Sequence, residues 1–103
     1  MRAVTKETVR AFFDRRERKI GNSQVIVYED RVRYLLHGNC IAELQGNNLR
    51  ISNAGWATPT TKERLNGLLE TFGACIYQKS YQWYLCLRGE EMPMQDGTWY
   101  WIE

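Results

Sequence analysis

Residues 31–52 read RVRYLLHGNCIAELQGNNLRIS and alternate apolar runs with two short polar turns. The runs 31–37, 40–45 and 49–52 are rich in β-branched, aromatic and leucine side chains, which is typical of strands. The tripeptides between them, HGN and GNN, supply the glycine and asparagine that tight hairpin turns need. The pattern therefore predicts consecutive antiparallel strands, and 24–28 adds another strand before them.

Apolar residues occupy every second position of the run around Tyr34, and Arg31 and Arg33 lie between them. Leu49 and Ile51 alternate with Arg50 in the same way. Because successive side chains of a strand point to opposite faces, one face of the sheet is expected to be buried and the other mostly in water.

The segment that follows this sheet predicts a helix ending at Gly73. Two starts fit the sequence. Thr60 and Glu63 have the spacing of a capping box, whereas Thr58 could cap a helix with Pro59 in its first position. The apolar stripe of this helix consists of Leu65, Leu68, Leu69 and Phe72.

A first helix is predicted at about 5–20, before the strands. Thr5 could cap it, Val9, Phe12 and Phe13 form its apolar stripe, and Gly21 with Asn22 could end it.

After the second helix, 74–78 and 81–87 predict a hairpin whose inward face carries Tyr81, Trp83, Leu85 and Leu87. Residues 89–97 are expected to form a polar loop, and 98–102 a last strand or a packed tail. The fold class is therefore α+β, an antiparallel sheet of five to seven strands with two helices packed on one face. A chain of 103 residues is long enough for a single domain, 1–103.

The cysteines and the hydropathy of the chain indicate whether a metal site is expected and in which compartment the protein is found. Cys40, Cys75 and Cys86 form no CxxC pair and have no histidine at ligand spacing, so no metal site and no cofactor are expected. The thiols are expected to be small buried hydrophobes. No apolar run is long enough for a signal peptide or a membrane span, which favours a cytoplasmic protein without membrane contact.

Catalysis is not expected. His37 is the only histidine, and it stands in a glycine–asparagine turn, where residues that tolerate positive φ are favoured for structural reasons. No nucleophile–base arrangement and no phosphate-binding glycine loop are recognisable, so no catalytic residue is assigned.

Basic residues are concentrated at the N-terminus, although the net charge is only +2. Residues 1–20 contain seven basic and three acidic side chains. The outer sheet arginines, Arg31, Arg33 and Arg50, would extend this basic surface if the first helix lay beside them. The basic candidates for a binding surface are Arg10, Arg15, Arg16, Arg18, Lys19, Arg31 and Arg33.

Aromatic residues make up 13% of the chain, including four tryptophans, which is more than so small a core can bury completely. We expect Trp99 and Trp101 to be partly exposed. Exposed aromatic rings beside arginines serve as anchors in protein interfaces and as stacking platforms for single-stranded nucleic acids. The sequence leaves both alternatives open.

Two segments carry a family resemblance: LHGNCIA at 36–42 and GWATPTTKERLN at 55–66. They resemble the LHGNxIA and GWxTxTTxxRLN segments of small uncharacterised proteins of tailed bacteriophages. The resemblance implies a phage origin and expression in the cytoplasm of a bacterial host. The order of elements also resembles that of a double-stranded-RNA-binding domain, whose GPxH loop and KKxAK helix start are missing here.

We therefore expect a non-catalytic phage accessory protein that binds a host or phage protein. Nucleic-acid binding through the basic N-terminal segment and the neighbouring arginines is the alternative.

Overall fold

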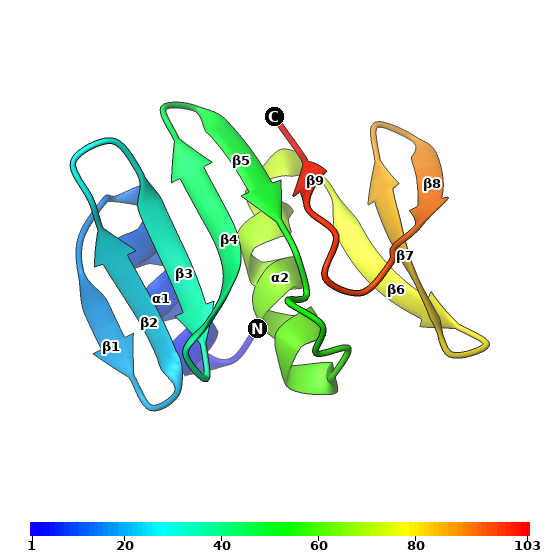
Figure 1. Ribbon diagram of the computed structural model, residues 1–103, viewed down its shortest axis with the longest axis horizontal. Coiled ribbons are helices and arrows are strands. Elements are labelled where there is room, and N and C mark those ends of the chain that lie inside the picture. Colours follow the sequence, from blue (N-terminus) through cyan, green and yellow to red (C-terminus); the bar gives the residue numbers. More distant parts are fainter.

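The meander at 31–52 forms the centre of a six-stranded antiparallel sheet in the computed structural model, which describes residues 1–103 (Figure 1). His37 and Gly38 form the turn between two of its strands, and both take positive φ, 52° and 79°. The strand order is β1-β2-β3-β4-β5-β9, so the last strand of the chain lies beside β5. The strands are β1 (Arg18–Ile20), β2 (Ser23–Val27), β3 (Val32–Leu36), β4 (Asn39–Gln45), β5 (Asn48–Ile51) and β9 (Tyr100–Trp101).

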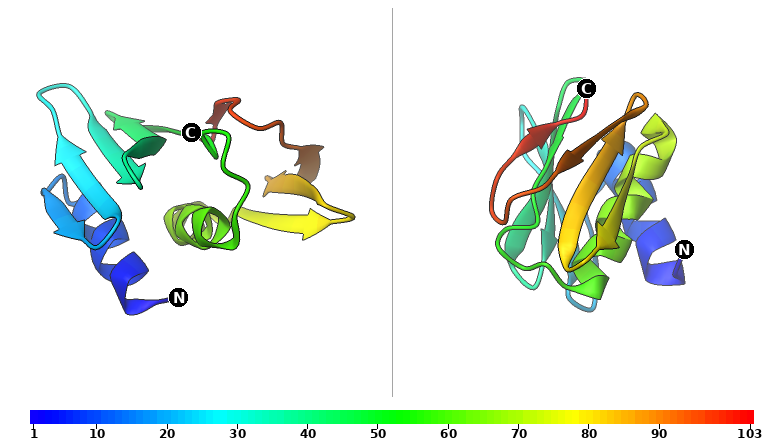
Figure 2. Two further views of the ribbon diagram at one scale, coloured as in Figure 1. Left: turned by 60° about the horizontal axis from the view of Figure 1, so that its bottom comes forward. Right: turned by 90° about the vertical axis from the view of Figure 1, so that its right-hand side faces the viewer.

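The predicted alternation along β3 is confirmed, since Val32, Tyr34 and Leu36 are buried and Arg33 and Leu35 are only half-buried. Both helices lie on the face that carries the buried residues, and the other face is left without a helix (Figure 2). We call this uncovered side the outer face.

The first helix is shorter than expected, and the prediction of a helix at 5–20 is wrong beyond its third turn. Helix α1 (Ala3–Phe13) ends where Arg15 takes a left-handed conformation with φ 55°. The chain then reverses, and Arg18–Ile20 pair with β2 as an edge strand. Gly21, which was expected to end a helix, forms the turn between these two strands with φ 57°. Thr5 does not cap the helix either, because it is buried within it.

Helix α2 (Pro59–Leu69) uses the second of the two predicted starts. The Thr58 side chain accepts a hydrogen bond from the Thr61 amide, and Pro59 occupies the first helical position. The predicted capping box of Thr60 and Glu63 does not form, because the Glu63 carboxylate binds Thr5 and Arg64 instead. A short 3₁₀ turn, η1 (Glu70–Phe72), continues the helix to Gly73, whose φ of 67° ends it as predicted.

The predicted hairpin after α2 forms a separate sheet with a third strand. The three-stranded sheet has the order β6-β7-β8, with strands β6 (Cys75–Lys79), β7 (Gln82–Leu87) and β8 (Glu90–Pro93). Strand β8 lies inside the expected polar loop 89–97, because Arg88 and Gly89 both take positive φ and turn the chain back along β7.

The inward face predicted for this hairpin is confirmed for Trp83 and Leu85, which are buried. It is wrong for Tyr81, which stands in the turn at φ 66° and is 96% exposed. The cysteines are not buried hydrophobes as expected, since Cys75 is exposed and Cys40 and Cys86 are half-buried.

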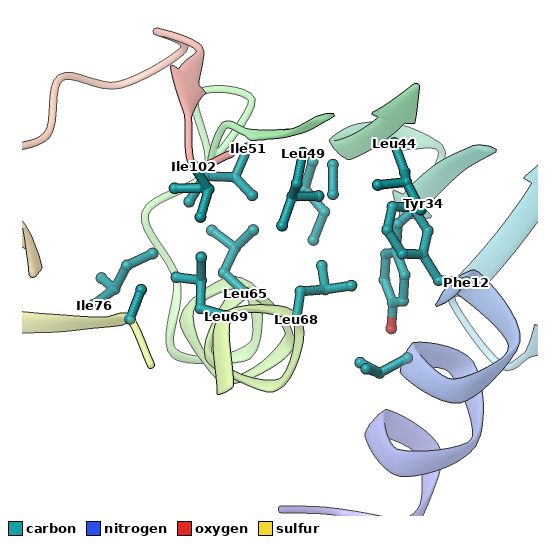
Figure 3. Packing of buried hydrophobic residues seen from close by; sticks show 14 of the residues in the cluster. Phe12, Tyr34, Leu44, Leu49, Ile51, Leu65, Leu68, Leu69, Ile76 and Ile102 are labelled. Carbon is teal, nitrogen blue, oxygen red and sulfur yellow. The ribbon is translucent and has the colours of Figure 1, made fainter. Parts of the chain in front are cut away.

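One hydrophobic core joins both sheets and both helices. Leu65, Leu68 and Leu69 of α2 lie between the two sheets, and Ile76 approaches them from the smaller one (Figure 3). All three leucines are fully buried, and each contributes roughly 1.5–3 kcal/mol relative to an exposed position. The core therefore holds the six-stranded sheet firmly from its inner side, while the outer face stays open.

Candidate binding face on the six-stranded sheet

A row of side chains runs across the outer face, one from each of four neighbouring strands. The register pairs Arg33 with Glu43, Glu43 with Arg50, and Arg50 with Trp101. Directly opposed residues of antiparallel strands project to the same side of the sheet, with their Cβ atoms about 4.5–5.5 Å apart. The pairing therefore places one arginine on each side of a single carboxylate, and a tryptophan beyond Arg50.

Glu43 is the centre of this row. Its Oε2 accepts a hydrogen bond from Nε of Arg33 at 2.8 Å, and its Oε1 accepts from Nε and Nη2 of Arg50 at 3.0 and 2.7 Å. A third guanidinium, that of Arg31, approaches Oε2 to 3.6 Å. The Glu43 side chain is only 7% exposed, so these arginines screen the carboxylate from water.

The pKa of Glu43 follows from this environment. Burial alone would raise the pKa, but the hydrogen bonds from Arg50 and Arg33 outweigh it and hold the pKa below the ordinary value for glutamate. The carboxylate is therefore ionised at neutral pH and fixes the arginines around it. Three guanidinium groups share it, and Asp30 at the edge pairs with Arg31, so the cluster keeps an excess of positive charge.

Aromatic rings cover the arginines on both sides of the row. The Arg50 guanidinium lies 4.5 Å from the ring centroid of Trp99 and 5.6 Å from that of Trp101. Arg33 lies 5.2 Å from the ring of Tyr28. Trp101 and Tyr28 remain 57% and 44% exposed. We call this set the Arg–aromatic face: Tyr28, Arg31, Arg33, Glu43, Arg50, Trp99 and Trp101.

Five of the residues proposed from the sequence meet in this face, namely Arg31, Arg33, Arg50, Trp99 and Trp101. Sequence reasoning missed Glu43 and Tyr28. The signal for Glu43 was present, because it is the one acidic residue of its predicted strand. Its partners could not be named without the strand register.

Most of the basic residues near the N-terminus lie elsewhere, since α1 packs on the inner side of the sheet (Figure 2). Arg10, Arg16 and Arg18 line a shallow hollow together with Glu7. The Arg18 guanidinium pairs with Glu7 at 3.4 Å, and that of Arg16 with Asp14 at 3.6 Å. For Arg10, Arg16 and Arg18, the expected continuity with the outer arginines is therefore wrong.

The other two basic candidates, Arg15 and Lys19, do not line this hollow. Arg15 donates a hydrogen bond to the carbonyl of Gly46 at 2.7 Å, which ties the end of α1 to the β4–β5 turn. Lys19 is exposed on the edge strand β1, opposite Gln24, and therefore projects to the outer side of the sheet, two strands away from β3.

A family model described as Kyanoviridae Gp96 protein matches residues 1–101, nearly the whole chain. The chain belongs to this family of phage proteins. No curated protein and no solved structure matches it. None of its helices has the length and apolar character needed to cross a membrane.

The two segments that carried the resemblance to phage proteins meet in space in this member of the Kyanoviridae Gp96 family. His37 and Asn39 from the first segment and Trp56 and Thr60 from the second line a pocket of about 490 Å³. His37 is the only ionisable side chain of the lining. Trp56 is 58% exposed there, so a tryptophan outside the C-terminal pair is also accessible.

Proposed function

We propose that this phage protein is a non-catalytic binding protein that engages another protein, of the phage or of its host, through the Arg–aromatic face. The observation that carries the proposal is the clustering of arginine, tryptophan and tyrosine around Glu43 on the face that no helix covers. These three residue types dominate the energetics of protein interfaces.

The face is organised before any partner binds. Glu43 fixes Arg33 and Arg50 by hydrogen bonds, and the stacked rings restrict the guanidinium of Arg50 further. A flexible arginine normally loses about 0.5–1.5 kcal/mol of conformational freedom when an interface immobilises it. Here most of that loss occurs on folding, which favours binding.

The charge of the face favours an acidic partner. Three arginines share one carboxylate, and exposed rings flank them. A protein segment that presents carboxylates next to apolar side chains would satisfy the free guanidinium donors and cover Trp101 and Tyr28.

Nucleic-acid binding is the competing function, because arginines between aromatic rings also stack on unpaired bases. Two observations favour a protein. The net charge of the chain is only +2, and Arg16 and Arg18 of the N-terminal basic segment are paired with Asp14 and Glu7, so they do not extend the positive charge of the face.

Affinity purification from nuclease-treated lysate of phage-infected host cells tests the proposal with three forms of the protein. Wild type and Tyr81→Ala are expected to retain the same acidic protein, because Tyr81 is 96% exposed but lies on the other sheet. Trp101→Ala is expected to lose it. Circular dichroism confirms that all three forms are folded.

Two outcomes would contradict the proposal. Equal retention by wild type and Trp101→Ala would exclude the Arg–aromatic face as the binding surface. Binding of labelled single-stranded DNA or RNA that weakens steeply with salt and is lost in Trp101→Ala would assign the face to nucleic acid instead.

A further inference from the structure

Two thiols face each other on the small sheet, away from the Arg–aromatic face. Cys75 of β6 and Cys86 of β7 are directly opposed in the antiparallel register. Cys75 is exposed and Cys86 is half-buried, and both are free. Tyr77 and Tyr84, the pair of opposed residues on the same side of the sheet, are stacked with their ring centroids 5.3 Å apart.

Directly opposed residues of an antiparallel pair have Cα atoms about 4.5 or 5.5 Å apart, depending on whether they exchange backbone hydrogen bonds. Disulfides span Cα separations of about 4.4–6.8 Å. Both kinds of pair lie in this range, so the spacing of the two strands permits a bond between the two sulfurs.

The chemical surroundings of Cys86 agree with a close thiol neighbour. Partial burial raises the pKa of Cys86, and the adjacent Cys75 thiol and the Glu91 carboxylate raise it further. Its Sγ lies 3.8 Å from Oε1 of Glu91. Cys40 is placed differently, since it lies on β4 of the other sheet and its thiol donates to the carbonyl of Ala42 at 3.4 Å.

We propose that Cys75 and Cys86 form a reversible cross-strand disulfide, which makes the small sheet a site of redox modification by low-molecular-weight disulfides such as oxidised glutathione. The inference is independent of the function proposed for the outer face.

The reaction is a double thiol–disulfide exchange. The more exposed Cys75 loses its proton to water, and its sulfur attacks one sulfur of the oxidised glutathione. The glutathione S–S bond breaks, and one glutathione thiolate leaves and takes up a proton.

Cys86 then loses its proton, and its sulfur attacks the sulfur of Cys75. The bond to the attached glutathione breaks, and the second glutathione thiolate leaves and is protonated. Two protein thiols are oxidised to one disulfide, and one glutathione disulfide is reduced to two thiols.

The cross-link would fasten β6 to β7 at the end of the hairpin that lies away from its turn. Ile76 and Leu85, the next opposed pair, belong to the core. The oxidised protein is therefore expected to unfold at a higher temperature than the reduced protein, because its unfolded chain has less conformational freedom.

Incubation with oxidised glutathione, followed by thiol counting and intact mass measurement, tests the proposal. Wild type is expected to fall from three free thiols to one, with no attached glutathione and no covalent dimer. Cys40→Ser is expected to fall to none and to show the higher unfolding temperature. Cys86→Ser is expected to accumulate glutathione on Cys75, because no second thiol can displace it.

Three outcomes would overturn the proposal. The first is that wild type keeps all three free thiols. The second is that it retains attached glutathione, and the third is that it forms disulfides only between chains. Thiol loss that is unchanged in a Cys75→Ser variant would also assign the reaction to other residues.

Discussion

Arg64 is the residue on which the two helices and the sheet depend together. It is only 6% exposed, and its Nε donates to the hydroxyl of Ser23 and its Nη1 to that of Thr5, both at 3.0 Å. It also pairs with the neighbouring Glu63. No other side chain of the chain links β2, α1 and α2 in this way, and only a planar guanidinium with several donors has the required shape.

Arg64→Ala is expected to lower the free energy of unfolding by about 2–4 kcal/mol, because it leaves buried polar groups without partners. Arg16→Ala is the control, since its ion pair with Asp14 is more than half exposed and is expected to contribute under about 0.5 kcal/mol. Urea unfolding of both variants measures the difference. Equal midpoints would show that Arg64 has no such role.

Gly67 allows α1 and α2 to approach closely. A Cβ at this position would lie 2.5 Å from Cγ2 of Thr5, whose hydroxyl is held by Glu63 and Arg64. Gly67→Ala is therefore expected to destabilise the protein by about 1–2 kcal/mol, although alanine is the better helix former by about 1 kcal/mol.

A double-variant cycle isolates this contact. Thr5→Ser removes Cγ2 and keeps the hydroxyl, so Gly67→Ala should be nearly neutral in that background. If thermal unfolding shows the same loss in both backgrounds, the contact between Gly67 and Thr5 does not limit the packing of the helices.

At the scale of elements, the start of α2 provides a test of local sequence signals. Thr58→Ala is expected to cost about 1 kcal/mol of stability, because the Thr58 hydroxyl caps the Thr61 amide. Thr60→Ala is expected to change stability by less than about 0.5 kcal/mol, since Thr60 caps nothing. A larger loss of stability in Thr60→Ala than in Thr58→Ala, measured by chemical denaturation, would show that Thr60 and Glu63 cap the helix instead.

The elements predicted best from the sequence are those whose side chains determine them locally. Helix α2 has a capping residue and a leucine stripe, and β3 has a strict alternation ended by a glycine turn. The short edge strands β1 and β8 have mostly polar sequences, RKI and EEMP. They form because a neighbouring strand offers free backbone groups, which the sequence of the edge strand does not reveal.

The candidate face was only partly predictable for a related reason. Alternation indicated that Arg31 and Arg33 point outward, and surplus aromatic residues indicated exposure of Trp101. These residues lie together near Glu43 because of the register of four strands. That register includes a shift beside Tyr34, which the sequence does not predict.

At the scale of the whole molecule, Glu43 links stability to pH. Its pKa is lowered in the folded protein, so its contribution is present above the ordinary glutamate pKa of about 4.3 and is lost as the pH falls through the lower folded value. Glu43→Gln is expected to lose about 1–2 kcal/mol of stability at neutral pH. It should also lose less stability than wild type on acidification below about pH 5.

Urea midpoints between neutral pH and pH 3 measure this difference. Parallel pH profiles of wild type and Glu43→Gln would show that the ion-pair cluster does not stabilise the fold.

Site-specific photo-crosslinking in phage-infected cells shows directly whether the outer face binds a protein. A photoreactive phenylalanine analogue is placed at Trp101 in the Arg–aromatic face or at Tyr81, the exposed control on the other sheet. We predict a defined protein adduct from position 101 and none from position 81. Adducts to nucleic acid from position 101, or protein adducts only from position 81, would show that the outer face is not a protein-binding surface.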